Sequence, residues 1–287
     1  MKKIVLVTGT STGFGKLITQ TLSKEGHTVI AAMRGVNDKN QAAAQELSKW
    51  PGVDVVELDV TSDTSVQETF EKSLAKYGHI DVLVNNAGVA GFGVAEAYTL
   101  DQVRRLFEVN FYGVLRTYNA VLPSMRARKD GLIINLSTGA SGFTVPFMVP
   151  YMASKFAMES LTEGFQAELK DYGIENVSIQ SGVYPTEMNT GVKTGVNADK
   201  EDIVAAYGSA AVDAFNAVGT ALFGKMAEFK MDPQTIADGV LELINKEKGT
   251  RPLRFPLDAI AQGTDHEFVK SRAEIKSRWA KNYGVSL

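Results

Sequence analysis

The pattern of the sequence predicts a doubly wound α/β fold, in which one parallel sheet carries helices on both faces. Short apolar runs rich in β-branched residues alternate with amphipathic segments through most of the 287 residues. Strand–helix alternation requires right-handed crossovers, which place helices on both faces of a parallel sheet. No Pro/Gly/Ser-rich linker divides the chain, so we expect a single domain, residues 1–287.

The expected elements follow one another in the order that this fold requires. Strands are expected at Ile4–Val7, Thr28–Ala32, Val53–Leu58, Ile80–Val84, Leu132–Leu136 and Val177–Ser181. Helices are expected at Lys16–Lys24, Asn40–Lys49, Ser65–Lys76, Leu100–Arg128 and Tyr151–Tyr172. Gly26 and Gly78 follow two of these helices as C-caps. A helix near Pro233–Lys246, a strand near Pro252–Pro256 and a charged helix complete the chain.

Composition excludes several classes of function. The chain is 44% hydrophobic and 22% charged, with a net charge of -3 and no long basic block, so we expect no nucleic-acid partner. Cysteine is absent, which rules out disulfides, cysteine nucleophiles and thiolate metal sites. The three histidines are far apart in sequence; we expect them at the surface and expect no metal site.

The beginning of the chain does not indicate a secretory signal. The apolar run Ile4–Val7 is too short for a signal core, and no stretch approaches the roughly 18 apolar residues of a membrane span. We therefore expect a cytoplasmic protein without membrane contact.

A glycine loop follows the first expected strand and opens the first expected helix. It reads TGTSTGFG over Thr8–Gly15. Glycines let the backbone turn tightly and approach a pyrophosphate, while the helix N-terminus supplies free N–H groups and positive potential. The spacing G-x-x-x-G-x-G differs from the usual G-x-G-x-x-G. A plain strand–helix turn is the alternative, but the position at the first β–α connection favours a dinucleotide site.

Two further motifs appear in order along the chain: N-N-A-G at Asn85–Gly88 and Y-x-x-x-K at Tyr151–Lys155. With the glycine loop, in which Phe14 stands where Ile is commoner, they resemble the short-chain dehydrogenase/reductase family over nearly the whole chain. The resemblance implies a Rossmann fold and a nicotinamide cofactor. It assigns cofactor contacts to Gly9, Ser11, Thr12, Gly13, Phe14, Gly15, Asp59, Val60, Asn86, Ala87, Gly88, Tyr151, Lys155, Val183 and Thr186.

Cofactor selectivity is indicated at the end of the second strand. NAD enzymes carry an acidic side chain near here that binds the ribose 2′-hydroxyl. This chain has Met33 there, followed by Arg34, whose guanidinium suits a 2′-phosphate. We therefore predict NADP(H) in preference to NAD(H). In the alternative, Arg34 faces solvent and Asp38 binds the ribose of NAD.

Tyr151 and Lys155 are four residues apart in an expected helix, so they share one face. A nearby ammonium and an oxidised nicotinamide both favour tyrosinate, and lower the pKa of the phenol from about 10. The phenol can then act as general acid or base. The alternative is an amphipathic helix with exposed ends.

The resemblance implies two more catalytic groups. A serine hydroxyl that contacts the substrate carbonyl is usual thirteen positions before the tyrosine, where this chain has Thr138 preceded by Ser137. We assign the role to Thr138, with Ser137 as the alternative, and expect both to line the substrate site. Asn110 corresponds to an asparagine that locally opens its helix and anchors a water; a satisfied core amide is the alternative.

Ser181 replaces the first proline of the family's P-G-x-x-x-T loop.

These observations predict an NADP(H)-dependent oxidoreductase that interconverts a carbonyl and an alcohol on a hydrophobic small molecule. Residues 190–230 break the strand–helix alternation with an apolar helical pattern, and we expect them to cap the substrate site. The Pro252–Pro256 region looks most like hydroxysteroid-dehydrogenase-like members. A cofactor-binding regulator without turnover and a 3-oxoacyl-type reductase are the alternatives. The resemblance also implies a homodimer or homotetramer through about 100–128 and 151–172.

Overall fold

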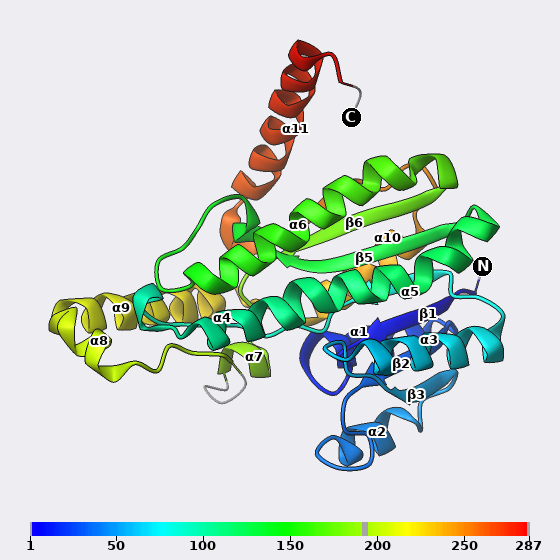
Figure 1. Ribbon diagram of the computed structural model, residues 1–287, viewed down its shortest axis with the longest axis horizontal. Helices are drawn as coiled ribbons and strands as arrows, with labels where there is room; N and C mark the ends of the chain where they lie inside the picture. Colours follow the sequence, from blue (N-terminus) through cyan, green and yellow to red (C-terminus); the bar gives the residue numbers. More distant parts are fainter. Residues whose placement is uncertain (1, 191–194, 286–287) are drawn as a thin grey trace.

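The computed structural model describes residues 2–190 and 195–285. In this part of the chain a parallel sheet has the strand order β3-β2-β1-β4-β5-β6-β7 (Figure 1). The strands are β1 Ile4–Thr8, β2 Thr28–Met33, β3 Val53–Glu57, β4 Val82–Asn85, β5 Gly131–Thr138, β6 Ile174–Ser181 and β7 Arg254–Leu257. The predicted doubly wound fold is confirmed.

Helices cover both faces of this sheet. On one face α1 and α10 pack together, and Ile18 and Val240 belong to its core. On the other face lie α3, α5 and α6, which contribute Phe70, Tyr118 and Met158 to a second core. The helices are α1 Gly13–Lys24, α2 Gln41–Leu47, α3 Asp63–Tyr77, α4 Leu100–Phe107, α5 Gly113–Arg128, α6 Val149–Leu169, α7 Glu187–Thr190, α8 Glu201–Ala206, α9 Gly208–Glu228, α10 Gln234–Asn245 and α11 Thr264–Tyr283.

Two parts of the chain extend from this three-layer body. α8 and α9 lie to one side of it, and α11 projects away from it (Figure 1). α11 is attached through Arg272 and Lys276, which both pair with Glu163 on α6. None of the helices in the described residues combines the length and apolarity needed to cross a bilayer.

The strand order reverses between β1 and β4, and ligands of open α/β sheets bind in the crevice beyond the carboxyl ends at such a point. The loops after these two strands are joined there. The hydroxyl of Thr8 accepts hydrogen bonds from the N–H groups of Asn86 at 3.1 Å and Ala87 at 3.0 Å. The topology therefore brings the glycine loop and the N-N-A-G motif together.

Most elements begin or end a few residues from their predicted bounds, and one predicted helix is interrupted. The helix expected over Leu100–Arg128 is interrupted by a π-helical turn, Glu108–Tyr112, between α4 and α5. Such turns accommodate a residue whose side chain bonds outside the helix, which here is Asn110. The last strand, predicted near Pro252–Pro256, spans Arg254–Leu257; just before it, the guanidinium of Arg251 donates to the carbonyls of Leu243 and Lys246 at the end of α10 at 2.6 and 2.7 Å.

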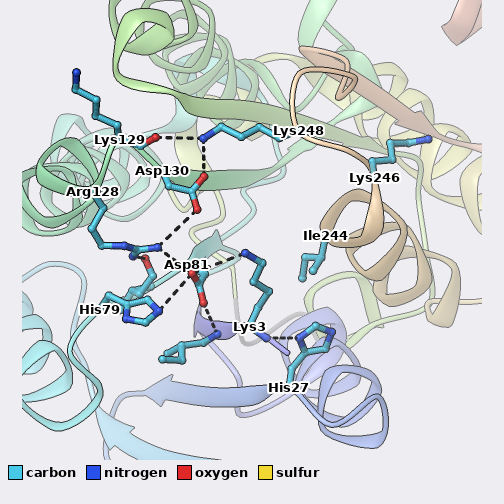
Figure 2. A network of polar contacts seen from close by, with 12 residues as sticks. Lys3, His27, His79, Asp81, Arg128, Lys129, Asp130, Ile244, Lys246 and Lys248 are labelled. Carbon is cyan, nitrogen blue, oxygen red and sulfur yellow. Dashed lines mark hydrogen bonds and ion pairs between the residues drawn. The ribbon is translucent and has the colours of Figure 1, made fainter. Parts of the chain in front are cut away.

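A buried carboxylate joins the elements at the amino edge of the sheet (Figure 2). Asp81 accepts hydrogen bonds from the N–H of Ile4 and from the guanidinium of Arg128, each at 2.9 Å. Lys3 and His79 lie 3.9 Å and 3.4 Å from the same carboxylate. Asp81 therefore links the start of β1, the start of β4 and the end of α5.

His27 corrects the prediction that all three histidines lie at the surface. It is 5% exposed, and its Nδ1 accepts a hydrogen bond from the N–H of Lys3 at 3.1 Å (Figure 2). The chain passes directly from the turn at Gly26 into β2. His27 therefore lies against the amino-terminal ends of the strands and does not project from a loop. Burial lowers the pKa of His27, and the positive N-terminus adds to this effect.

Candidate active site

A cavity of about 750 Å³ opens at the carboxyl ends of the strands. It brings together nearly all of the residues that the sequence assigned to the site; Gly15 and Asn110 are not part of its wall. The assigned residues that line it are Gly9, Ser11, Thr12, Gly13, Phe14, Arg34, Asp59, Val60, Asn86, Ala87, Gly88, Ser137, Thr138, Tyr151, Lys155, Val183 and Thr186.

Two glycines give the first loop its shape. Gly9 has a φ of +71°, and a Cβ at this position would lie 2.8 Å from the Cα of Ala87. Gly13 has a φ of +52° and begins α1 on the cavity wall. The backbone therefore adopts a left-handed conformation and a close approach that only glycine permits at low cost.

The N-terminus of α1 has the features of an anion site. Thr12 is the N-cap, and its side chain makes no hydrogen bond to the first turn of the helix. Thr12 and Phe14 line the cavity at this helix end, where N–H groups and the helix dipole favour negative charge. Asn86 fixes the loop, since its Nδ2 donates to the carbonyls of Thr8 and Gly9 at 2.8 and 2.9 Å. This arrangement fits the pyrophosphate of a dinucleotide.

Arg34 and Asp59 lie together where β2 and β3 meet the cavity. The Arg34 side chain is 49% exposed, with NH1 3.9 Å from Oδ2 of Asp59. Oδ1 of Asp59 accepts hydrogen bonds from the N–H and hydroxyl of Thr61 at 2.9 and 2.7 Å. Partial burial opposes ionisation, but these bonds and Arg34 lower the pKa of Asp59 below its ordinary value.

Two other acidic side chains near Arg34 are engaged in the turn after β2. The carboxylate of Glu57 accepts the N–H groups of Gly35 and Val36 at 2.7 and 2.9 Å. Asp38 accepts the N–H of Lys39. Neither Glu57 nor Asp38 lines the cavity, whereas Arg34 does.

Tyr151 and Lys155 lie one turn apart in the first half of α6. They are 8% and 7% exposed, and Nζ of Lys155 donates to the carbonyl of Leu136 at 2.8 Å. Burial raises the pKa of Tyr151 to about 12. Burial also lowers the pKa of Lys155 to about 8, against the opposing effect of the Glu159 carboxylate.

The pKa of Tyr151 is raised in the protein alone, whereas the expectation from sequence was a lowered pKa. That expectation considered the Lys155 ammonium and an oxidised nicotinamide, but burial also removes the water that would stabilise a phenolate. In the protein alone this loss of hydration dominates, so the phenol keeps its proton at neutral pH. A protonated phenol beside a cavity is a proton donor.

Thr138 and Ser137 end β5 and both line the cavity. Oγ1 of Thr138 accepts the N–H of Ala140 at 3.4 Å, a long contact that leaves its O–H free to donate. Oγ of Ser137 is buried and has no hydrogen-bond partner among the described residues. Ser181, which replaces the usual proline, donates from its hydroxyl to the carbonyl of Ser137 at 3.0 Å and so ties β6 to β5.

We expect Thr138→Val to lower kcat/KM for carbonyl reduction about 100-fold, because it removes one hydrogen-bond donor to the developing alkoxide while keeping the side-chain volume. Ser137→Ala should change kcat/KM less than about threefold, because the assignment gives the Ser137 hydroxyl no hydrogen bond to the alkoxide. Thr138→Ser serves as the control that restores the hydroxyl. The assignment is wrong if steady-state kinetics show the larger loss for Ser137→Ala.

Asn110 lies in the π-helical turn and is fully buried. Its Oδ1 accepts the N–H of Val89 and its Nδ2 donates to the Val89 carbonyl, both at 2.9 Å. The same amide donates to Oγ of Ser154 at 3.0 Å. Asn110 therefore links the loop after β4 to α6, one residue before Lys155, without forming part of the cavity wall.

The sequence analysis missed one wall of the cavity. Phe92, Pro146, Phe147 and Met148 line it from two loops. Phe147 has a φ of +64°, which is unusual for a bulky side chain, and its carbonyl accepts the N–H of Gly93 at 2.8 Å. Isolated apolar residues in loops carry no periodic signal, so sequence reasoning had no means to find them.

The glycine loop at the reversal point of the parallel sheet shares one cavity with the buried Tyr151–Lys155 pair, an arrangement typical of oxidoreductases that bind a dinucleotide. The chain belongs to the short-chain dehydrogenase family: the family model described as short chain dehydrogenase matches residues 3–197. As a member, it is an oxidoreductase that acts on CH–OH groups and interconverts a carbonyl and an alcohol.

Individual relatives agree with this membership. The uncharacterized oxidoreductase YusZ of Bacillus subtilis is 35% identical over 263 residues, which is 89% of each chain. The 3-ketodihydrosphingosine reductase of Bacteroides thetaiotaomicron is 35% identical over 204 residues, 70% of this chain and 72% of the relative. A structural alignment with a solved short-chain dehydrogenase from Streptomyces avermitilis covers 100% of this chain and 99% of that chain, with a TM-score of 0.79 and 27% identity.

Proposed function

We propose that the protein is a cytoplasmic, NADP(H)-dependent reductase of hydrophobic ketones or aldehydes, with Tyr151 as general acid. The observation that carries this proposal is that Tyr151, Lys155 and Thr138 share one cavity with the glycine cradle. The Tyr151 phenol is protonated at neutral pH and lines the cavity, so it can donate its proton to a carbonyl oxygen.

The side chains divide the work at the carbonyl. A bound, reduced nicotinamide cofactor would supply the hydride. Tyr151 gives its phenolic proton to the carbonyl oxygen, and Thr138 holds the same oxygen with its hydroxyl. Lys155, anchored on the Leu136 carbonyl, supplies a positive charge that eases loss of the Tyr151 proton. We propose that Asn110 positions these groups by holding Ser154 and Val89.

The test is consumption of NADPH across a panel of aromatic ketones, aldehydes, steroids and sugars, repeated with NADH. We expect turnover of hydrophobic members and an efficiency with NADPH at least about tenfold higher, since one charge-assisted contact to the 2′-phosphate is worth that much. Equal or better efficiency with NADH contradicts the cofactor assignment. Tight NADPH binding with no turnover supports the alternative of a catalytically silent regulator.

Arg34 is the residue proposed to select the phosphate. We expect Arg34→Ala to raise the KM for NADPH about 10- to 100-fold, because a charge-assisted hydrogen bond is lost. The KM for NADH should change little, since NADH has no 2′-phosphate. Arg104→Ala, which alters an exposed ion pair with Asp101, is the matched control. A similar loss with both cofactors would show that Arg34 acts on the fold of the loop instead.

Two relatives bear on the reaction and the cofactor. The Bacteroides relative is named as a keto reductase, which favours reduction of a ketone. The solved alcohol dehydrogenase of Thermococcus sibiricus, 25% identical with a TM-score of 0.70, is titled as a complex with 5-hydroxy-NADP, which favours NADP(H). A 3-oxoacyl-type reductase is the competing enzyme, and the α8–α9 extension argues against it. We further propose a homodimer or homotetramer through α4, α5 and α6.

A further inference from the structure

One face of α9 forms a continuous apolar stripe along the cavity. The residues of this stripe recur every three or four positions, so they share one side of the helix. They run from Ala211 to Met226, about 22 Å at 1.5 Å per residue. The stripe consists of Ala211, Val212, Phe215, Val218, Gly219, Leu222, Phe223 and Met226, and all of them line the cavity.

The other walls of this part of the cavity are also apolar. The ring of Phe147 meets that of Phe215 edge-on at 5.6 Å, which joins the opposite loop to α9. In the part of the chain that the structure describes, the charged side chains that line the cavity are Arg34, Asp59, Lys155 and Glu187. None of them belongs to α9 or to the loop that faces it.

The base of the α8–α9 extension is fixed to the body of the protein. The N–H of Val196 donates to the carbonyl of Ala90 at 2.8 Å, and Nε2 of Gln102 donates to the carbonyl of Asn197 at 2.6 Å. Tyr151 belongs to the same apolar cluster as Val196. Tyr151 and the stripe also line the same cavity, so the proton donor and the apolar face of α9 open into one space.

The stripe is incompletely covered by the protein itself. Val212 is 41% exposed and Phe223 is 51% exposed, although both line the cavity. Covering such surface with an apolar ligand is favourable by about 25 cal/mol per Å². A ligand that lies along α9 would gain this energy over the whole stripe.

We propose that the substrate is a ketone with a long, unbranched apolar chain, bound with its carbonyl at Tyr151 and its tail along α9. This inference rests on the proposed function. The apolar lining residues on α9 form one row about 22 Å long from Ala211 to Met226, which matches an extended chain better than a compact polycyclic ligand. The carbonyl carbon gains the hydride and the oxygen gains the Tyr151 proton, so NADPH is oxidised and the ketone becomes an alcohol.

Methyl ketones from butanone to hexadecanone test the proposal. We expect kcat/KM with NADPH to rise about two- to fourfold per added methylene, the effect of burying one methylene, until the tail reaches the end of the stripe. A steroid ketone should be reduced less efficiently than the best of these chains. A flat dependence on chain length, with butanone still reduced, would overturn the inference and leave the proposed function intact. No turnover of any ketone would instead contradict the proposed function.

Gly219→Leu locates the tail. A Cβ at Gly219 meets no atom within 4 Å, so a leucine can enter the cavity without displacing the protein. We expect the ratio of kcat/KM for the longest ketones to kcat/KM for butanone to fall at least about tenfold in this variant. Gly224→Leu is the matched control: its Cβ also has open space on the same helix, but Gly224 does not line the cavity. Equal chain-length profiles for the two variants would overturn the placement of the tail on α9.

Discussion

Tyr151→Phe should lower kcat for ketone reduction about 10³-fold, a far larger effect than the loss of one hydrogen bond to NADPH would have on its Kd. The substitution removes the phenolic proton and keeps the ring, and general acid catalysis of this kind contributes 10²- to 10⁴-fold. Burial holds the pKa of this phenol at about 12, so the group that the variant lacks is a protonated donor at neutral pH. Single-turnover kinetics with bound NADPH isolates the chemical step from product release.

Tyr118→Phe is the matched control for this prediction. Tyr118 is also a fully buried tyrosine whose pKa is raised by burial, and its hydroxyl donates to Asn176 at 2.9 Å, but it does not line the cavity. We expect the control to lose stability and to keep its kcat. Equal losses of kcat in the two variants would mean that Tyr151 acts through packing and not through proton transfer.

The parts of the site that were predicted from sequence depend on local geometry. Gly9 and Gly13 were identified because their neighbours in the chain form a strand and a helix, which fixes where a phosphate can lie. Tyr151 and Lys155 were paired because a helix places residues four apart on one face. Both predictions depend only on residues close in sequence, so they hold whatever the arrangement of the rest of the chain.

The parts that sequence reasoning missed depend on contacts between distant segments. Phe147 reaches the cavity through a loop with positive φ, which no pattern of residue types indicates. Burial by surrounding segments raises the pKa of Tyr151 in the protein alone, an effect that the charges of Lys155 and an oxidised nicotinamide do not include. His27 was placed at the surface because a turn precedes it, yet the sheet edge buries it.

The second large effect is a loss of stability, and it is expected far from the active site, at the amino-terminal ends of the strands. Asp81→Ala should lower the free energy of unfolding by about 2 kcal/mol, because the Ile4 N–H loses its acceptor and Arg128 keeps only its longer ion pair with Asp130. The Asp81 side chain is 10% exposed and bonds both Arg128 and the N–H of Ile4 (Figure 2). Asp81→Asn should lose less, since an amide oxygen can still accept the Ile4 N–H.

Asp101→Ala provides the comparison, because Asp101 also pairs with an arginine but is 84% exposed. Exposed pairs are worth less than about 1 kcal/mol, so urea unfolding should separate the two variants clearly. Equal losses would mean that burial does not set the strength of the Asp81 pair. At urea concentrations below its unfolding midpoint, the Asp81→Ala variant should still bind NADPH normally. Asp81 precedes the start of β4, whereas the glycine loop and the rest of the cofactor site lie beyond the end of β4. Weakened NADPH binding in the folded variant would instead show that the two edges of the sheet are coupled through β1 and β4.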